Sequence, residues 1–365
     1  MAPRLRALWP ALVALLVSGG FAGSRLVAAD WDPLALATIG TRFQQGDPSG
    51  TPGYDGQFAY YIALDPEPSE AAPHLDVPAY RYQRILYPLL AWALALGNMD
   101  LVPWTLLIIN LVAHFAGTWA LAAILDRRGH WTGFALSYGL WVGLAAGVGL
   151  DLTEPMAYAL ICAAWLARER GRAHLGSWLI CLSLLTKETG VFFWAGLLTA
   201  DLVSRAPWRT LWPLGLAGAI FAAWQVALWG IFGQLGVGSG GDLATPFEWI
   251  PFLGFLRIGL VEPAALALFA VIFGPTVLFP AVWGIVAAAR QAAQRVWIPE
   301  VWALLLNAAS IPFLPFSTFR EPLGLVRVVS GLILATVLFS SALGLRRPLA
   351  YSLSWCALLA ILLSG

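Results

Sequence analysis

Apolar segments long enough to cross a lipid bilayer follow one another along most of this chain. Short polar connections separate eleven of them, which lie at 7–28, 101–125, 131–150, 155–167, 174–186, 190–204, 208–233, 263–289, 298–316, 323–344 and 349–364. A helix needs about 20 apolar residues to span a membrane, and fewer where it borders a cavity or a thinned bilayer. The sequence therefore predicts an all-α, polytopic helical membrane protein with about 11 transmembrane helices.

Composition argues against a soluble alternative. Hydrophobic residues make up 59% of the chain and charged residues only 11%, with a mean hydropathy of +0.75. Soluble domains carry about a quarter charged residues, so this chain could not cover a soluble surface, and we expect membrane lipid to surround it. A net charge of +1 without a Lys/Arg run gives no indication of a nucleic-acid partner. The 365 residues suit a single membrane domain, 1–365.

A twelfth apolar piece, 85–97, decides the topology, because a crossing there would invert everything after it. If it does not cross and the N-terminus is cytoplasmic, thirteen of the 21 basic residues lie at cytoplasmic ends: Arg4, Arg6, Arg127, Arg128, Arg168, Arg170, Arg172, Arg205, Arg209, Arg290, Arg295, Arg346 and Arg347. The positive-inside rule favours this arrangement. We therefore expect a juxtamembrane helix at 85–97, within a first extracytoplasmic loop at 29–100, and a second such loop at 234–262.

Four short polar motifs interrupt the hydrophobic pattern, and this topology places all four on the extracytoplasmic side. They are Tyr54-Asp55-Gly56-Gln57, Asp151-Leu152-Thr153-Glu154-Pro155, Thr186-Lys187-Glu188-Thr189 and Arg320-Glu321-Pro322. Their common side predicts one functional site on the outer face, although each motif also has a plain structural explanation.

Asp55 is the candidate for chemistry. Asp-Gly is a strong turn dipeptide, so Asp55 and Gly56 alone would be explained by a turn, but the glutamine and aromatic residues that follow would not. The functional interpretation is a carboxylate held at the membrane surface as a general base.

The second and third motifs can be explained by helix capping and by ion pairing. Pro155 suits the first turn of a helix and Asp151 or Thr153 suits its N-cap, which leaves Glu154 least explained. Only 32 residues separate Arg172 from Arg205, so each arm of that hairpin reaches about 23 Å and its tip, Lys187-Glu188, should lie below the outer surface. Charges there are costly unless they are paired or face a wet cavity.

Arginines lie at the end of the first loop and at the start of the next-to-last span. Arg81 and Arg84 end the loop, and Arg320 precedes the span. A guanidinium suits bidentate phosphate binding, while snorkelling to lipid headgroups is the structural alternative.

The order and sidedness of these motifs resemble the GT-C glycosyltransferases, polytopic membrane enzymes that use polyprenyl-phosphate sugars. The resemblance covers roughly the first 200 residues and includes Asp55, the run Tyr80-Arg81-Tyr82-Gln83-Arg84, Asp151 with Glu154, and Lys187-Glu188. It implies that Asp55 is the catalytic base. The protein is then expected in the plasma membrane of a bacterium. Many members pair two acids in the first loop, but here Tyr54 precedes Asp55, so Asp47 or nothing would be its partner. A divalent metal cofactor is thus left open.

The sequence predicts transfer of a sugar from a polyprenyl-phosphate donor to an acceptor on the extracytoplasmic face. The expected substrate-binding residues are Tyr54, Gln57, Arg81, Arg84, Asp151, Glu154, Lys187, Glu188, Arg320 and Glu321. A transporter or lipid flippase is the main alternative, since it would also bury Lys187, Glu188 and Arg327. A non-catalytic assembly subunit, the third alternative, would tolerate loss of Asp55.

Overall fold

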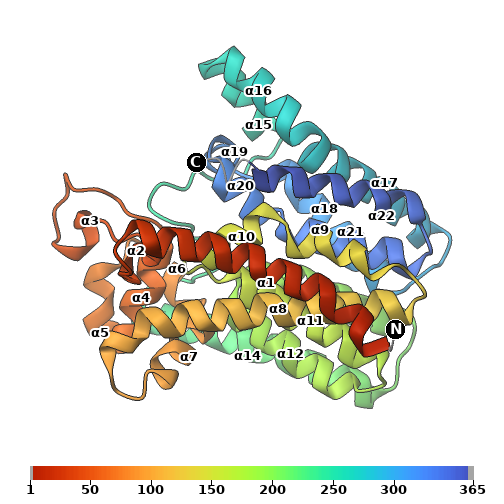
Figure 1. Ribbon diagram of the computed structural model, residues 1–365. Helices are drawn as coiled ribbons and strands as arrows, with labels where there is room; N and C mark the ends of the chain where they lie inside the picture. The colour runs from red at the N-terminus through yellow and green to blue at the C-terminus, as the bar shows by residue number, and fades with distance from the viewer. Residues whose placement is uncertain (1–2, 361–365) are drawn as a thin grey trace.

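The computed structural model describes residues 3–360, and over that range it contains helices, turns and loops but no strand. The long helices run side by side, and the short helices α2 to α6 gather at one end of them (Figure 1). The α-helices are α1 Pro3–Ala28, α2 Leu34–Ala37, α3 Thr41–Gln44, α4 Gly56–Leu64, α5 Pro68–Ala71, α6 Pro78–Tyr82, α7 Leu86–Leu94, α8 Val102–Arg127, α9 Leu136–Gly139, α10 Val142–Gly149, α11 Glu154–Glu169, α12 Ala173–Thr186, α13 Val191–Val203, α14 Trp208–Phe232, α15 Leu253–Val261, α16 Pro263–Phe273, α17 Phe279–Ala293, α18 Pro299–Ser310, α19 Phe316–Arg320, α20 Pro322–Val328, α21 Ser330–Ala342 and α22 Arg346–Ser352.

Five helices of the described chain are long and apolar enough to cross a membrane. They lie at Arg6–Ala28, Met99–Arg127, Trp208–Phe232, Pro263–Ala293 and Pro322–Ala342. The pair Thr132–Gly139 and Val142–Gly149 adds a sixth if its two parts, bent by 56°, form one broken span. These segments match expected spans, so the all-α class is confirmed and the chain is compatible with an integral membrane protein.

The predicted number of about 11 transmembrane helices is not supported. The expected spans 155–167, 174–186, 190–204, 298–316 and 349–364 coincide with shorter helices, of which α11 is the longest at 16 residues and α22 the shortest at 7. A 16-residue helix rises only about 24 Å, less than a hydrocarbon core of about 30 Å. The lengths of the apolar segments alone did not reveal that the helices within them are shorter. The last four residues of 349–364 lie outside the described range.

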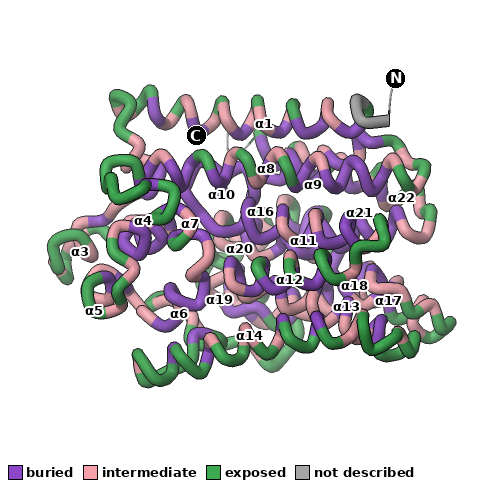
Figure 2. Tube along the Cα trace, turned by 90° about the horizontal axis from the view of Figure 1, so that it is seen from below, coloured by how far each residue is buried: buried purple, intermediate pink, exposed green. Residues whose placement is uncertain are grey.

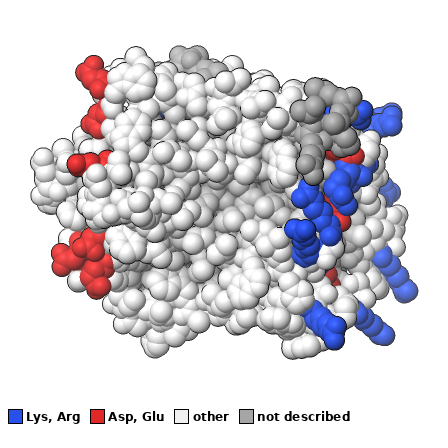
Figure 3. Space-filling view, turned by 60° about the horizontal axis from the view of Figure 1, so that its bottom comes forward, with Lys and Arg blue, Asp and Glu red and all other residues white. Residues whose placement is uncertain are grey.

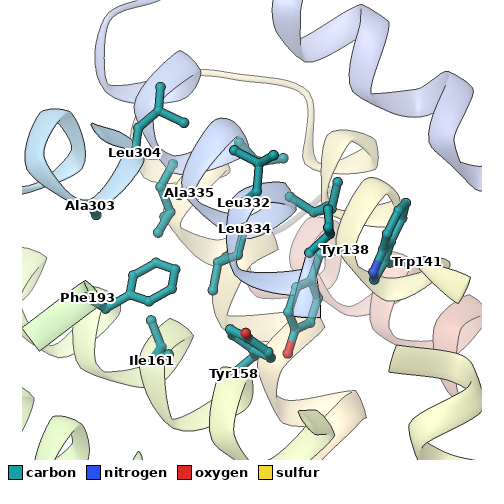
Figure 4. Close-up of a cluster of buried hydrophobic side chains, with 14 of the residues drawn as sticks. Tyr138, Trp141, Tyr158, Ile161, Phe193, Ala303, Leu304, Leu332, Leu334 and Ala335 are labelled. Atoms are coloured by element: carbon teal, nitrogen blue, oxygen red, sulfur yellow. The ribbon is translucent and has the colours of Figure 1, made fainter. Parts of the chain in front are cut away.

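The core, and not lipid, surrounds much of the short helices. Tyr158 and Ile161 of α11, Phe193 of α13, and Leu304 of α18 meet Leu332 of α21 in one buried cluster (Figure 4). Tyr158 and Trp165 both pack edge-on against Phe193, at centroid distances of 6.3 and 5.6 Å. Aromatic pairs at this geometry add stability beyond the area that they bury.

Other helices form an apolar periphery. In the apolar windows of α1, α14 and the α16–α17 helix, 22–28% of the residues are buried, against 83% for α20–α21. Figure 2 shows exposed positions along α1 and α14 and buried positions in the middle of the molecule. Leu16, Val226 and Val271 are each more than 60% exposed. Apolar surface of this extent favours contact with lipid.

Charged residues separate to opposite ends of the molecule. Figure 3 shows basic side chains with a few acidic ones among them at one end of this face, acidic side chains at the other, and an uncharged belt between the two. At the basic end, Arg128 binds Glu169 at 2.6 Å, Glu300, and the carbonyl oxygen of Leu338 at 2.8 Å, which ties α8 to α11, α18 and α21. The side chain of Arg4 lies outside the described range. Helix α7 has nine residues, about 14 Å, so it cannot span alone.

Serine-to-cysteine labelling tests this orientation. In a background with Cys162, Cys181 and Cys356 replaced by alanine, cysteines at Ser49 and Ser239 are expected to react with an impermeant reagent on intact cells, because the positive-inside rule places them outside. A cysteine at Ser204, at the basic end, is expected to react only after permeabilisation. All three serines are exposed, so access to water is matched. Labelling of Ser204→Cys on intact cells would contradict the topology.

Candidate functional site

A polar cavity of about 540 Å³ lies between the first loop and the ends of the central helices. Ten of the eleven predicted site residues line it: Tyr54, Asp55, Gln57, Arg81, Arg84, Glu154, Lys187, Glu188, Arg320 and Glu321. Asp151 lines a second cavity of about 20 Å³, which shares Asp55, Arg81 and Arg84 with the first. The four motifs, scattered over more than 260 residues of sequence, thus meet in one place.

Asp55 is held between two arginines. Its Oδ1 lies 3.0 Å from Nη1 of Arg81 and its Oδ2 lies 2.8 Å from Nη2 of Arg327. Burial acts to raise the pKa of the Asp55 carboxyl, but the positive charges of Arg81, Arg327 and Arg84 outweigh it and hold that pKa well below its usual range. Asp55 therefore faces the cavity as a carboxylate.

Local packing fixes where Asp55 stands. The predicted turn is present, since the Gln57 backbone amide donates to the Tyr54 carbonyl oxygen at 3.1 Å, but the Asp55 side chain makes no capping bond to α4, so the turn leaves its carboxylate unexplained. A Cβ atom on Gly56 would lie 2.2 Å from the carbonyl oxygen of Leu150, so only glycine lets the loop approach the bundle this closely. Gln57 accepts a hydrogen bond from the Gly40 amide at 3.0 Å and donates one to Pro52 O at 2.7 Å. Its amide therefore holds the loop in shape.

Glu154 forms the buried base of the site. One of its oxygens, Oε1, lies 3.1 Å from Nζ of Lys187 and accepts a hydrogen bond from Nε of Arg327 at 2.8 Å. The predicted helix start is confirmed, with Thr153 at the N-cap and Pro155 in the first turn, but neither Asp151 nor Thr153 makes a side-chain cap bond, so capping does not explain the acids of this motif. The helix begins at Glu154, which directs this carboxylate at two cations from other segments.

Arg84 and Glu188 form the neighbouring pair. Nε and Nη2 of Arg84 donate to the two carboxylate oxygens of Glu188 at 2.8 and 2.6 Å, and Nη2 also reaches the Tyr80 hydroxyl at 2.5 Å. Burial acts to raise the pKa of Glu188, but Arg84 and Lys187 lower it to about 2. The predicted hairpin is present, since the turn at Lys187 and Glu188 joins α12 to α13.

Asp151 takes a different position from the other predicted acids. Its side chain is fully buried, and neither carboxylate oxygen has a hydrogen-bond partner among the described residues. Burial raises its pKa well above the ordinary value, against the opposing charge of Arg25. Asp151 thus stands behind the site, and not on the wall of the larger cavity.

The fourth motif lines the outer wall. Tyr54 donates a hydrogen bond to Oε1 of Glu321 at 2.9 Å and accepts one from Nη1 of Arg327 at 2.9 Å. Arg320 lies over the ring of Phe316, and within residues 3–360 it forms no ion pair. Arg320 is thus a cation on the cavity wall whose charge is not already matched by an acid.

The connection between α14 and α15 closes one side of the cavity. Asp242 pairs with Arg42 at 2.9 Å, and its amide donates to Oδ2 of Asp76 at 3.2 Å. Thr245 is bound to Ser317 through its amide at 3.0 Å. These few contacts tie the second outer connection to the first loop and to α19.

The residues present do not fit a metal centre. The described part of the chain contains no group of three His, Cys, Asp or Glu side chains that could hold an ion. The cavity acids Asp55, Glu154 and Glu188 each already face a basic side chain. Asp47 binds the amide and hydroxyl of Ser49 and does not line either cavity, so it is not the partner acid of Asp55.

Three site residues were missing from the predicted set. Arg327 donates to Asp55, Glu154 and Tyr54, yet it stands inside an apolar segment, where its two-turn offset from Arg320 was the available signal. Asp76 binds Arg81 through two bonds of 2.7 Å, and nothing in the first loop distinguished it from the other acids there. Tyr80 belongs to the run that carries the family resemblance.

Comparison with known proteins adds nothing to this geometry, because no family model, no curated protein and no solved structure matches the chain.

Neutralising Glu154 is expected to destabilise the protein. Glu154→Gln leaves Lys187 and Arg327 buried with less compensating charge, and breaking a buried ion pair costs about 3–5 kcal/mol. The exposed Glu70, which no described ion pair involves, gives the matched control Glu70→Gln, whose change should stay within about 0.5 kcal/mol. Thermal unfolding in detergent measures the stability of both variants. Equal stability of the two would contradict the claim that the Glu154 ion pairs stabilise the fold.

Proposed function

We propose that this chain is a membrane glycosyltransferase that moves a sugar from a polyprenyl-phosphate donor to an acceptor on the extracytoplasmic face. The observation that carries the proposal is the ionised Asp55 on the wall of a charged cavity of about 540 Å³. The five long apolar helices and the segregation of charge support a membrane-embedded protein with a cytoplasmic N-terminus.

Asp55 is the proposed general base. The acceptor hydroxyl gives its proton to the Asp55 carboxylate while its oxygen forms a bond to the anomeric carbon of the sugar. The bond between that carbon and the phosphate oxygen breaks at the same time, and the polyprenyl phosphate leaves with the bonding electrons. The exposed fraction of the Asp55 side chain, 28%, gives an acceptor access to it.

The cations of the cavity are the proposed phosphate site. Nη1 of Arg84 has no protein partner in the part of the chain that the structure describes, and Nζ of Lys187 has one ion-pair contact for its three donors. Arg320 adds an unpaired charge on the wall. Such donors stabilise the negative charge that develops on the leaving phosphate.

A transporter or flippase remains the second candidate, because Lys187, Glu188 and Arg327 are all at least three-quarters buried. Substrate sites of transporters commonly lie at the middle of the bilayer, between repeated halves. The cavity here is lined instead by the first loop and by the short helices α4, α6, α19 and α20, and the first-loop helices lie at one end of the molecule (Figure 1). That position favours the enzyme.

Removing the base is expected to abolish transfer without preventing donor binding. Asp55→Asn keeps the size of the side chain, and loss of a general base lowers turnover by about 10²- to 10⁴-fold. The matched control is Asp47→Asn, in the same loop but outside both cavities. The measurement is release of sugar from a panel of polyprenyl-phosphate sugars by purified protein with an envelope extract as acceptor. Near-normal turnover of Asp55→Asn would defeat the catalytic assignment.

Arg320 and Arg257 allow a matched test of phosphate binding. Both guanidiniums lie over the Phe316 ring, but only Arg320 lines the cavity, whereas Arg257 pairs with Glu248. A hydrogen bond to a charged group contributes about 1.5–3 kcal/mol, so Arg320→Gln should weaken donor binding roughly 10- to 100-fold. Arg257→Gln should leave it unchanged. Calorimetric titration with polyprenyl phosphate measures both, and equal effects would remove Arg320 from the phosphate site.

A further inference from the structure

The proposed base is poorly suited to its task before a donor binds. A carboxylate that receives charged contacts from both Arg81 and Arg327 holds protons weakly, and general bases work best with a pKa near the operating pH. Either Asp55 accepts the proton against this bias, or something in the reaction cycle removes the bias.

We propose that Asp55 is a latent base, held as a carboxylate by Arg81 and Arg327 until the negative charge of the donor phosphate, bound nearby at Arg84, Lys187 and Arg320, offsets those arginines and lets Asp55 accept a proton. This inference rests on the proposed function and assigns an order to it: the acceptor is deprotonated only in the donor-loaded protein.

The geometry makes Asp55 the partner that can be released. Arg81 is held by Asp76 through two bonds of 2.7 Å, against one contact of 3.0 Å to Asp55. Arg327 is held by Glu154 at 2.8 Å and by the Tyr54 hydroxyl at 2.9 Å, against one contact of 2.8 Å to Asp55. The side chains of Asp76 and Glu154 are 7% and 0% exposed, whereas that of Asp55 is 28% exposed. A neutral Asp55 would therefore leave neither arginine without an acid.

The charge of the cavity supplies the driving force. The charged set around the base contains four cations, Arg81, Arg84, Lys187 and Arg327, and four acids, Asp76, Glu154, Glu188 and Asp55 itself. A phosphodiester adds a negative charge to this balanced set, and a nearby anion raises the proton affinity of a carboxylate.

Other groups facing the site do not change this balance before binding. At the rim, Arg42 pairs with Asp242, and Arg320 and Glu321 add one charge of each sign without pairing with each other. The larger cavity is therefore lined by six basic and six acidic side chains. The hydroxyls of Tyr54 and Tyr80 already accept hydrogen bonds from Arg327 and Arg84, respectively. Asp151, on the small cavity behind Asp55, has no hydrogen-bond partner within the described chain.

The chemical step keeps this balance. The donor diester has one negative charge and the leaving phosphate monoester has two, while Asp55 goes from a carboxylate to a neutral acid as it takes the acceptor proton. The total charge in the cavity is therefore the same before and after transfer. Departure of the monoester lets Arg81 and Arg327 draw the proton off Asp55 again.

Proton-linked binding tests the inference without any acceptor. The probe is an alkyl methyl phosphate, a diester with one negative charge, titrated calorimetrically in pairs of buffers that differ in ionisation enthalpy, between about pH 4 and 7. Wild-type protein is expected to take up a fraction of a proton per bound probe at the lowest pH of this range. Because the bound state holds the proton more tightly, binding strengthens as pH falls, about tenfold for each pKa unit that Asp55 gains.

Two variants identify the titrating group. Asp55→Asn should bind the probe without proton uptake, and Asp47→Asn should behave like the wild type. Binding without uptake in the wild type, or uptake that persists in Asp55→Asn, would overturn the inference but leave the proposed function standing. Failure of the probe to bind the wild type would overturn both.

A spectroscopic measurement covers the case in which Asp55→Asn does not fold. In infrared difference spectra of wild-type protein at the lowest pH of the titration, adding the probe is expected to increase absorption by neutral carboxyl groups and to decrease absorption by carboxylates. An unchanged carboxyl band under saturating probe contradicts the latent-base proposal.

Discussion

Ion pairs shielded from water hold together the parts of this chain that are farthest apart in sequence. Arg327 joins the first loop to α11 through Asp55 and Glu154, and Arg84 joins the first loop to the α12–α13 turn through Glu188. Withdrawing such charges from water is costly, and well-packed apolar residues are often as stable. The network is therefore better explained by the site that it builds than by the stability that it adds.

The two ends of the molecule use the same kinds of residue in different ways. At the basic end, Arg128 and Arg168 bind Glu169 and Asp201 from adjacent helices, away from both polar cavities. At the other end, ion pairs line a cavity and retain donors for a ligand. Since the cavity balances its own charges, the proposed lipid-phosphate donor would bring the one negative charge that this set does not already contain.

The composition of the site was more predictable than its internal pairing. The topology rule placed four motifs on one side, and the structure brings ten of eleven chosen side chains to one cavity. The pairing of Arg81 with Asp76 could not be predicted, because it depends on how a loop folds over helices. Arg327 was left out of the predicted site, since the apolar run around it is typical of a lipid-facing helix, although 83% of that helix window is buried. The number of membrane-spanning helices was overestimated for a related reason. Hydropathy indicates which residues avoid water, but it does not indicate whether protein or lipid surrounds them.

The contact between Gly56 and the Leu150 carbonyl has a consequence for the evolution of this site. A side chain at position 56 would push the first loop away from the bundle, and Asp55 with it, so the two neighbours serve one requirement. Mutational drift can replace a turn glycine by asparagine or aspartate at modest cost, but it cannot do so here. In descendants that retain the cavity, Asp55 and Gly56 should be inherited as a pair, and loss of the glycine should mark lineages in which the site has fallen out of use.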